Sequence, residues 1–159
     1  MIAFIRIDDR LIHGQVVTGW TRRKSINYIL AVDDKTAADT FQCRMMRMAI
    51  PAGCTADIKS VDDAVEILNS GKYDKKNVFI IVKSAKTLLE LESKGITLTQ
   101  EINVGNLRGK GKVVSAPYII IDEEEIAAMK ELSSRTAKFY ARLLPDDKEY
   151  DLKSALAKL

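Results

Sequence analysis

Histidine and cysteine are scarce in this chain: its 159 residues include one histidine and two cysteines. Cys43 and Cys54 do not have the C-x-x-C spacing of a metal-binding or redox pair. With one histidine, a zinc site would need both cysteines and a carboxylate as well. We therefore expect two reduced thiols, no metal and no bound cofactor.

The chain also lacks long apolar runs and blocks of like charge. No run approaches the roughly 18 apolar residues of a membrane span. The N-terminus lacks the basic flank and cleavage site of a signal peptide. These absences predict a cytoplasmic protein, which can still dock on a membrane complex. A net charge of +3 without a basic-aromatic stripe argues against nucleic-acid binding, although it suits an acidic protein partner.

What is present fits one globular domain over residues 1–159. The composition is 47% hydrophobic and 30% charged, a balance that can build a sizeable core and argues against wholesale disorder. No internal repeat, linker or low-complexity segment divides the chain. We therefore predict a single domain.

The first fifteen residues combine a strand pattern with a polar loop. Residues 2–7 are largely apolar, the bend Asp8-Asp9-Arg10 follows, and His13-Gly14-Gln15 leads into a helix over residues 15–24. A loop between a strand and a helix presents backbone N–H groups at the helix N-terminus. This is a common position for a bound phosphate in α/β proteins.

Strand and helix patterns then alternate along the chain. Strands are predicted at residues 27–32, 56–59, 78–82 and 101–104, with helices at residues 36–49, after Ser60 and after Ser84, which caps its helix. In the helix over residues 36–49, Phe41, Met45 and Met48 are expected to fill the core. The order predicts an α/β fold with an open, mainly parallel sheet and helices on both faces.

The last third has shorter elements. Residues 107–112 are expected to form a mobile basic loop, followed by short strands at residues 112–115 and 118–121. An acidic first turn predicts a helix over residues 122–134, residues 138–143 suit an edge strand, and Asp151 caps a terminal helix.

Active sites of open parallel sheets lie beyond the carboxyl ends of the strands. Polar residues follow several of the predicted strands, so they are expected to share one edge of the molecule. They are Asp8, Asp9, Arg10, His13, Asp33, Asp34, Lys83, Ser84 and residues 103–106.

Within this set His13 is a candidate phosphoryl acceptor, because an imidazole is mostly unprotonated and nucleophilic at neutral pH. Arg10 offers a bidentate fork for phosphate oxygens, and Asp8 or Asp9 can orient Arg10 or the imidazole. Gly14 and Gln15 supply helix-terminus N–H groups, and Gly14 allows close approach. The residues alone leave an alternative open, an ordinary loop histidine bonded to a backbone carbonyl.

Residues 6–20 (RIDDRLIHGQVVTGW) closely resemble the phosphorylation-site stretch of the enzyme IIB subunits of the bacterial sugar phosphotransferase system, mannose/fructose/sorbose family. The likeness continues at residues 32–34, 49–51, 102–105 and 144–145, so it covers essentially the whole chain. It implies that His13 is the phosphorylated histidine and Arg10 the arginine beside it. Asp8 and Arg6 match other charged positions of the stretch.

The resemblance implies a seven-stranded, mainly parallel sheet and a cytoplasmic protein–phosphohistidine–sugar phosphotransferase. Such a protein takes phosphoryl from the IIA subunit and delivers it to a hexose-type sugar bound by the membrane subunits IIC and IID. Lys83 and Ser84, at a neighbouring strand end, are further candidates for orienting the phosphate. The identity of the sugar and the formation of a homo-oligomer stay open.

Two other functions remain to be distinguished. Asp9, Asp33 and Lys83 imitate the residue set of receiver-like regulatory modules, which are phosphorylated on aspartate. A binding subunit without transfer activity is the other possibility, against which the intact loop argues. The cations Arg22, Arg23 and Lys24, and those of residues 108–112, are candidates for docking an acidic partner or are solvated surface groups.

Overall fold

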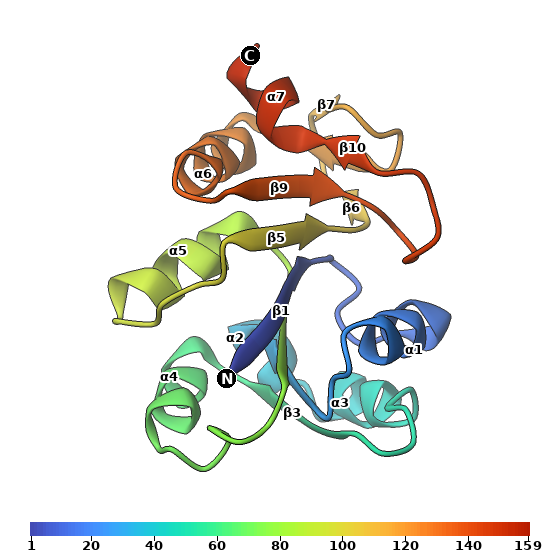
Figure 1. Ribbon diagram of the computed structural model, residues 1–159, viewed down its shortest axis with the longest axis vertical. Helices are drawn as coiled ribbons and strands as arrows, with labels where there is room; N and C mark the ends of the chain where they lie inside the picture. Colours follow the sequence, from blue (N-terminus) through green and yellow to red (C-terminus); the bar gives the residue numbers. More distant parts are fainter.

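The computed structural model describes residues 1–159, and a seven-stranded sheet forms its centre (Figure 1). The strand order is β10-β9-β5-β1-β4-β2-β3, and every pair is parallel except β10 with β9. The predicted open, mainly parallel α/β fold is confirmed. The strands are β1 (Ile2–Ile7), β2 (Tyr28–Val32), β3 (Thr55–Lys59), β4 (Val78–Val82), β5 (Glu101–Val104), β9 (Lys138–Ala141) and β10 (Tyr150–Asp151).

Helices cover both faces of this sheet, as expected. On one face lie α1 (Gly14–Arg23) and α3 (Thr40–Arg47); on the other lie α4 (Val61–Asn69), α5 (Ala85–Ser93) and α6 (Glu123–Ser133) (Figure 1). The short helices are α2 (Asp34–Ala37) and α7 (Leu152–Ala157). The core is accordingly divided into two clusters, of 29 and 14 buried residues.

Strand β1 contributes to both clusters, because successive side chains of a strand point to opposite faces. Phe4 joins the smaller cluster and stacks on Trp20 of α1, with ring centroids 4.8 Å apart. Ile5 and Ile7 join the larger cluster and are fully buried. This packing fixes the strand whose carboxyl end opens into the loop at Asp8.

The single helix predicted over residues 36–49 is wrong. The structure has two helices, α2 and α3, because Asp39 is a cap: its side chain accepts the Gln42 N–H at 3.1 Å and starts α3 afresh. The expected methionine core face is also wrong. Phe41, Met45 and Met48 are 71%, 54% and 79% exposed, and of the methionines in this segment only Met46 is buried.

The basic segment at residues 107–112 differs from the predicted loop. Its ends form strands β6 (Leu107–Arg108) and β7 (Lys112–Val113), which pair with β8 (Ile119–Ile121) in the order β6-β8-β7. Only a turn at residues 109–111 remains outside these strands. The predicted edge strand is also corrected, since β10 covers β9. Asp151 caps α7 as expected, accepting the Ser154 N–H at 3.1 Å.

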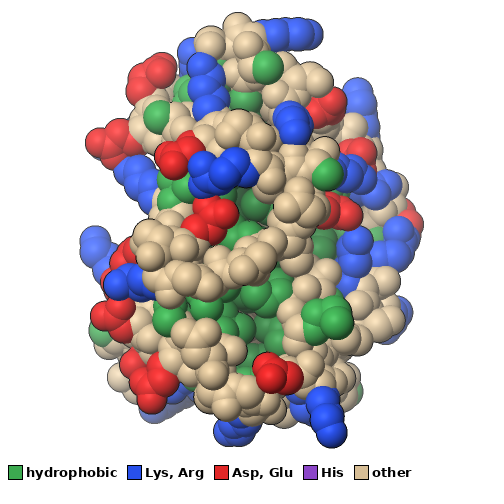
Figure 2. All heavy atoms as spheres, turned by 60° about the vertical axis from the view of Figure 1, so that its left-hand side comes forward, with side chains coloured by type: hydrophobic (Ala, Val, Ile, Leu, Met, Phe, Trp, Pro, Cys, Tyr) green, Lys and Arg blue, Asp and Glu red, His purple; other side chains and the backbone are tan.

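The face turned forward in Figure 2 has a furrow in which apolar side chains are visible. A hollow of about 270 Å³ on the side of α4 includes Ile2, Leu68, Tyr73 and Ile96 in its lining. None of the helices has both the length and the apolar character required to cross a membrane.

Candidate active site

The loop after β1 is held by the ends of two neighbouring strands. The Asp8 N–H donates to the Val82 carbonyl at 2.8 Å, and the Asp9 N–H donates to the Asn106 carbonyl at 3.0 Å. Gly14, at the start of α1, has a φ of +36°, and a Cβ there would meet no atom within 4 Å. Its positive φ explains the glycine, because other residues rarely adopt that backbone angle.

His13 occupies the N-cap position of α1, but its side chain makes no capping hydrogen bond. Its Nδ1 lies 3.1 Å from the Leu11 carbonyl, whereas its buried Nε2 has no partner. A bond to a backbone carbonyl is what the ordinary-histidine alternative expects, but it occupies only one ring nitrogen. Burial lowers the pKa of His13, and the Leu11 carbonyl and Asp8 partly oppose this.

The first turn of α1 has unused hydrogen-bond donors. The N–H groups of Gly14, Gln15 and Val16 donate to no protein acceptor, and the first bond of the helix runs from Val17 N–H to the His13 carbonyl. No acidic residue stands in this turn. The positive end of α1 is therefore free to hold an anion beside His13.

The guanidinium of Arg10 is held by Asp8 through one of its edges, and the side chain remains accessible to solvent. Its Nε and Nη2 donate to Asp8 at 3.2 and 3.3 Å, and its backbone N–H donates to the same carboxylate at 3.0 Å. The side chain is 41% exposed. The predicted orientation of Arg10 by Asp8 is present, and Asp9 does not share in it.

Asp8 is buried between two guanidinium groups. Burial alone would raise the pKa of its carboxyl, but the charge of Arg6 and the hydrogen bonds from Arg10 hold that pKa below its usual value. Arg6 is fully buried and donates to Asp8 at 2.9 Å and to the Arg142 carbonyl at 2.9 Å. From the end of β1, Arg6 therefore positions Asp8.

Two further residues complete the support of Arg6. The Asn103 side chain accepts from Arg6 Nη1, and Gly105 leaves room for the guanidinium, since a Cβ there would lie 2.1 Å from Nη2. The sequence marked Asn103 only as a polar strand end, and Gly105 only through the resemblance of residues 102–105. Their common role depends on the pairing of β5 with β1.

The other predicted site residues, Asp9, Lys83 and Ser84, line a pocket that does not include His13 or Arg10. Asp9 accepts from the Asn106 side chain at 3.0 Å and from the Arg108 N–H at 2.8 Å, so it ties the loop to β6. It lines a separate pocket with Lys83 and Ser84, which neither His13 nor Arg10 lines. Lys83 also lies 3.7 Å from Asp33. Thus Lys83 and Ser84 belong to a neighbouring site, and Ser84 makes no side-chain capping bond.

The candidate docking cations near α1 are mostly engaged. Arg23 pairs with Asp146, and Lys24 lies 3.6 Å from Glu101, whereas Arg22 forms no ion pair. Arg22 lines a hollow of about 560 Å³ between α1 and the segment after β9, which Gln15 and Asp147 also line. Of the basic segment, Lys112 pairs with Glu123. No group of three His, Cys, Asp or Glu side chains is arranged to hold a metal ion.

The fold and this loop define an open-sheet α/β protein whose candidate site combines one histidine, one accessible arginine and a free helix N-terminus. The family described as "PTS system sorbose subfamily IIB component" matches residues 2–159. The chain belongs to this family of IIB components of sugar phosphotransferase systems.

Individual relatives agree with this assignment. The chain is 30% identical to the sorbose-specific EIIB component of Lacticaseibacillus casei, over 96% of the chain and 93% of that protein. It is 32% identical to the mannose-specific EIIAB component of Escherichia coli, of which it spans about half, 49%. A crystal structure of the IIBSor domain of the sorbose permease from Klebsiella pneumoniae has a TM-score of 0.90 at 26% identity, covering 99% of this chain and 97% of that one.

Proposed function

We propose that this protein is a phosphoryl carrier that accepts a phosphoryl group on His13 from a phosphohistidine of a IIA component. It then passes the group to a sugar bound by the membrane components IIC and IID. One observation carries the proposal: His13 stands at the N-cap of α1, beside three backbone N–H groups that donate to no protein acceptor.

The residues of the loop have different roles in the transfer of the phosphoryl group. The unprotonated ring nitrogen attacks phosphorus, forming a new P–N bond as the P–N bond to the donor histidine breaks. The phosphoryl oxygens carry most of the charge, so the transition state needs positioning and electrostatic stabilisation. Arg10 and the N–H groups of Gly14, Gln15 and Val16 supply this, while Asp8 and Arg6 hold Arg10 in place.

In the second step a sugar hydroxyl attacks the phosphoryl group. A P–O bond forms as the P–N bond to His13 breaks. The imidazole nitrogen keeps the electron pair of that bond and is regenerated neutral, and the hydroxyl proton passes to water. Because the two transfers have similar chemistry, the same loop serves both partners in turn. We expect the carrier to act in the cytoplasm and to dock on the membrane components for this step.

The test is phosphorylation of the purified chain by a phosphorylated IIA component. The label on the wild-type chain should be lost in acid and survive in base, and His13→Gln should take up none. A matched check of the folding of His13→Gln by circular dichroism separates lost acceptance from lost structure. An acid-stable label, or a label that persists in His13→Gln, would refute the proposal.

The same experiment addresses the aspartate-modified alternative. Lys83 lies 3.7 Å from Asp33 and lines one pocket with Asp9, as the receiver-like interpretation expects of this set. An acyl phosphate on aspartate is labile in base, and its formation requires Mg²⁺. A base-labile, Mg²⁺-dependent label would therefore assign the chain to that class.

A further inference from the structure

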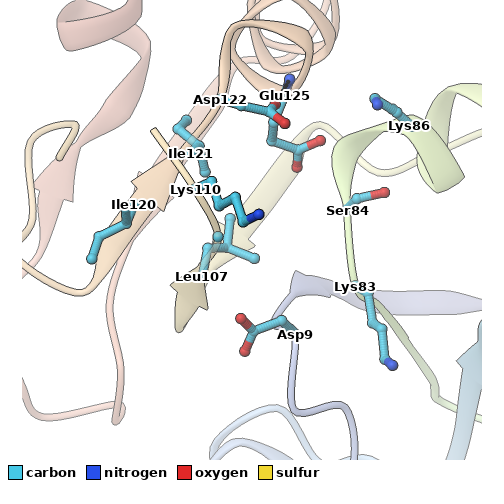
Figure 3. Close-up of a pocket in the computed structure, with 11 residues that line it drawn as sticks. Asp9, Lys83, Ser84, Lys86, Leu107, Lys110, Ile120, Ile121, Asp122 and Glu125 are labelled. Carbon is cyan, nitrogen blue, oxygen red and sulfur yellow. Dashed lines mark hydrogen bonds between the residues drawn. The ribbon is translucent and has the colours of Figure 1, made fainter. Parts of the chain in front are cut away.

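A second pocket lies beside the loop and is separate from His13 (Figure 3). It has a volume of about 230 Å³ and is formed by the end of β1, the β4–α5 junction, the turn at residues 109–111 and the start of α6. Leu107, Ile120 and Ile121 supply its apolar wall. Its polar lining includes Asp9, Ser84, Lys110, Asp122 and Glu125.

Glu125 gives this pocket a buried carboxylate oxygen that has no hydrogen-bond partner. The residue is only 8% exposed, and its Oε2 accepts the Ala85 N–H at 2.8 Å, which caps α5 from outside that helix. Its Oε1 is buried and has no partner. Figure 3 shows the carboxyl group directed into the space between α6 and Ser84. A buried polar atom left without a partner is costly, so a ligand that bonds to it gains free energy.

Two further groups around the pocket are also available. Ser84 stands at the N-cap of α5, but Glu125 takes the cap, and the Ser84 hydroxyl has only a 3.4 Å contact with Thr87 Oγ1. Lys110 forms no ion pair, and its ammonium group points toward the centre of the pocket in Figure 3. Lys83, by contrast, points away. The pocket thus offers a carboxyl oxygen, a hydroxyl and an ammonium.

The charge balance of the lining selects among ligand classes. Asp9, Asp122 and Glu125 oppose an anion, and Lys110, whose ammonium group points into the pocket, opposes a cation. A hydroxyl group can donate to a carboxylate and accept from an ammonium, so several hydroxyls on one molecule match the mixed lining. The volume lies below the roughly 300–1,000 Å³ of pockets for drug-sized ligands, which limits the occupant to a small molecule.

We propose that this pocket binds a neutral polyhydroxylated molecule about the size of one sugar ring, held by Glu125, Ser84 and Lys110. The apolar wall contacts its carbon skeleton. Asp9 connects the pocket to the loop, since it both lines the pocket and bonds to Asn106 and Arg108. Binding requires no phosphorylation of His13 and is independent of the carrier function.

The test is an NMR titration of the ¹⁵N-labelled full chain with three neutral probes: D-mannose, L-sorbose and myo-inositol. At least one probe should give saturable shifts at the amides of residues 84–87 and 109–111. Ser84→Ala and Glu125→Gln should each weaken that binding about five-fold, the loss of one hydrogen bond. Ser84 makes no capping bond, so Ser84→Ala keeps the test valid if Glu125→Gln fails to fold.

The controls separate this site from the surface and from the carrier function. Glu90→Gln changes an exposed carboxylate of α5 that lies outside the pocket. This variant should bind the probe as wild type does. His13→Gln should also bind normally, whatever its effect on phosphorylation. The proposal is overturned if none of the three probes gives saturable shifts, or if Ser84→Ala and every folded pocket variant bind like wild type.

Discussion

Arg6 and Arg10 have the same side chain and bind the same carboxylate, yet the loop gives them different tasks. Arg6 is fully buried, and its two terminal nitrogens donate to Asp8, Asn103 and a backbone carbonyl. Arg10 is 41% exposed and contacts only Asp8. Exposure therefore makes Arg10 the guanidinium that can reach a phosphoryl group, and burial makes Arg6 its indirect support.

Removing the Arg10 side chain should slow transfer far more than it affects folding. Arg10→Ala takes away a phosphate donor, which we expect to reduce the rate of phosphoryl uptake by about 10- to 100-fold. The free energy of unfolding should change by less than about 1 kcal/mol, because the ion pair is partly exposed. A time course of phosphoryl uptake from the IIA component measures the rate, and urea denaturation measures the free energy of unfolding.

The control for this change is Arg22→Ala, which removes an exposed arginine of α1 that forms no ion pair. It should leave phosphoryl uptake from the IIA component within about two-fold of wild type. A larger loss would assign Arg22 to the docking of that component. Equal uptake rates in wild type and Arg10→Ala would show that Arg10 does not stabilise the transferring group.

The pKa of His13 is a second observable at this scale. Burial disfavours the imidazolium, so the pKa lies below its usual value of 6.5 and the neutral, nucleophilic form persists as the pH falls toward that value. Because the chain has one histidine, its Cε1–H resonance can be followed through a pH titration without assignment ambiguity. A midpoint at or above 6.5 would contradict this account.

The sequence indicated the candidate residues His13 and Arg10 directly, but not the residues that support them. His13 and Arg10 stand next to each other in a loop whose position follows from the apolar run before it. The partners of Arg6 come from β5 and from beyond β9, so their role emerges only when distant segments pair. The failure of Ser84 to cap α5 also became visible only with α6 in place, because Glu125 of α6 accepts the Ala85 N–H instead.

At the scale of elements, continuous apolar runs gave reliable predictions, whereas caps gave mixed ones: Asp151 caps its helix as predicted, but the cap at Asp39 was missed. The strands β2 and β4 are continuous hydrophobic runs, buried at every position, and both were predicted. The helix over residues 36–49 was misassigned because Asp39 can end one helix and cap the next. Residues 107–112 were misassigned because strands of two residues have no detectable periodicity.

Helix α3 gives a matched pair of substitutions for this correction. Met46 is 9% exposed and packs in the smaller core cluster, whereas its neighbour Met45 is 54% exposed. Met46→Ala should lower the free energy of unfolding by about 2 kcal/mol or more. Met45→Ala should change it by less than about 0.5 kcal/mol. Equal losses in urea denaturation would restore the interpretation of Met45 as a core residue.

At the scale of the whole molecule, one sheet separates two core clusters and shares its strands with both. Because β1 and β4 contribute side chains to each cluster, neither cluster can be lost while the other keeps its packing. We therefore predict that residues 1–159 unfold as one cooperative unit, the behaviour of a single domain.

The only tryptophan, Trp20, reports on the smaller cluster, while far-ultraviolet circular dichroism reports on all the helices. In urea the fluorescence and dichroism transitions should coincide at one midpoint with one slope. Two separated transitions would mean that the two sides of the sheet unfold independently, and the single-domain prediction would be wrong.

The measurement that tests the central claim most directly is the position of the phosphoryl group on the wild-type chain. After phosphorylation by a IIA component, digestion with trypsin at neutral pH or above releases residues 11–22, which contain His13 and no aspartate. We predict that tandem mass spectrometry finds the group on His13 in this peptide. Modification of the peptides carrying Asp8 and Asp9 or Asp33, with residues 11–22 unmodified, would contradict the account.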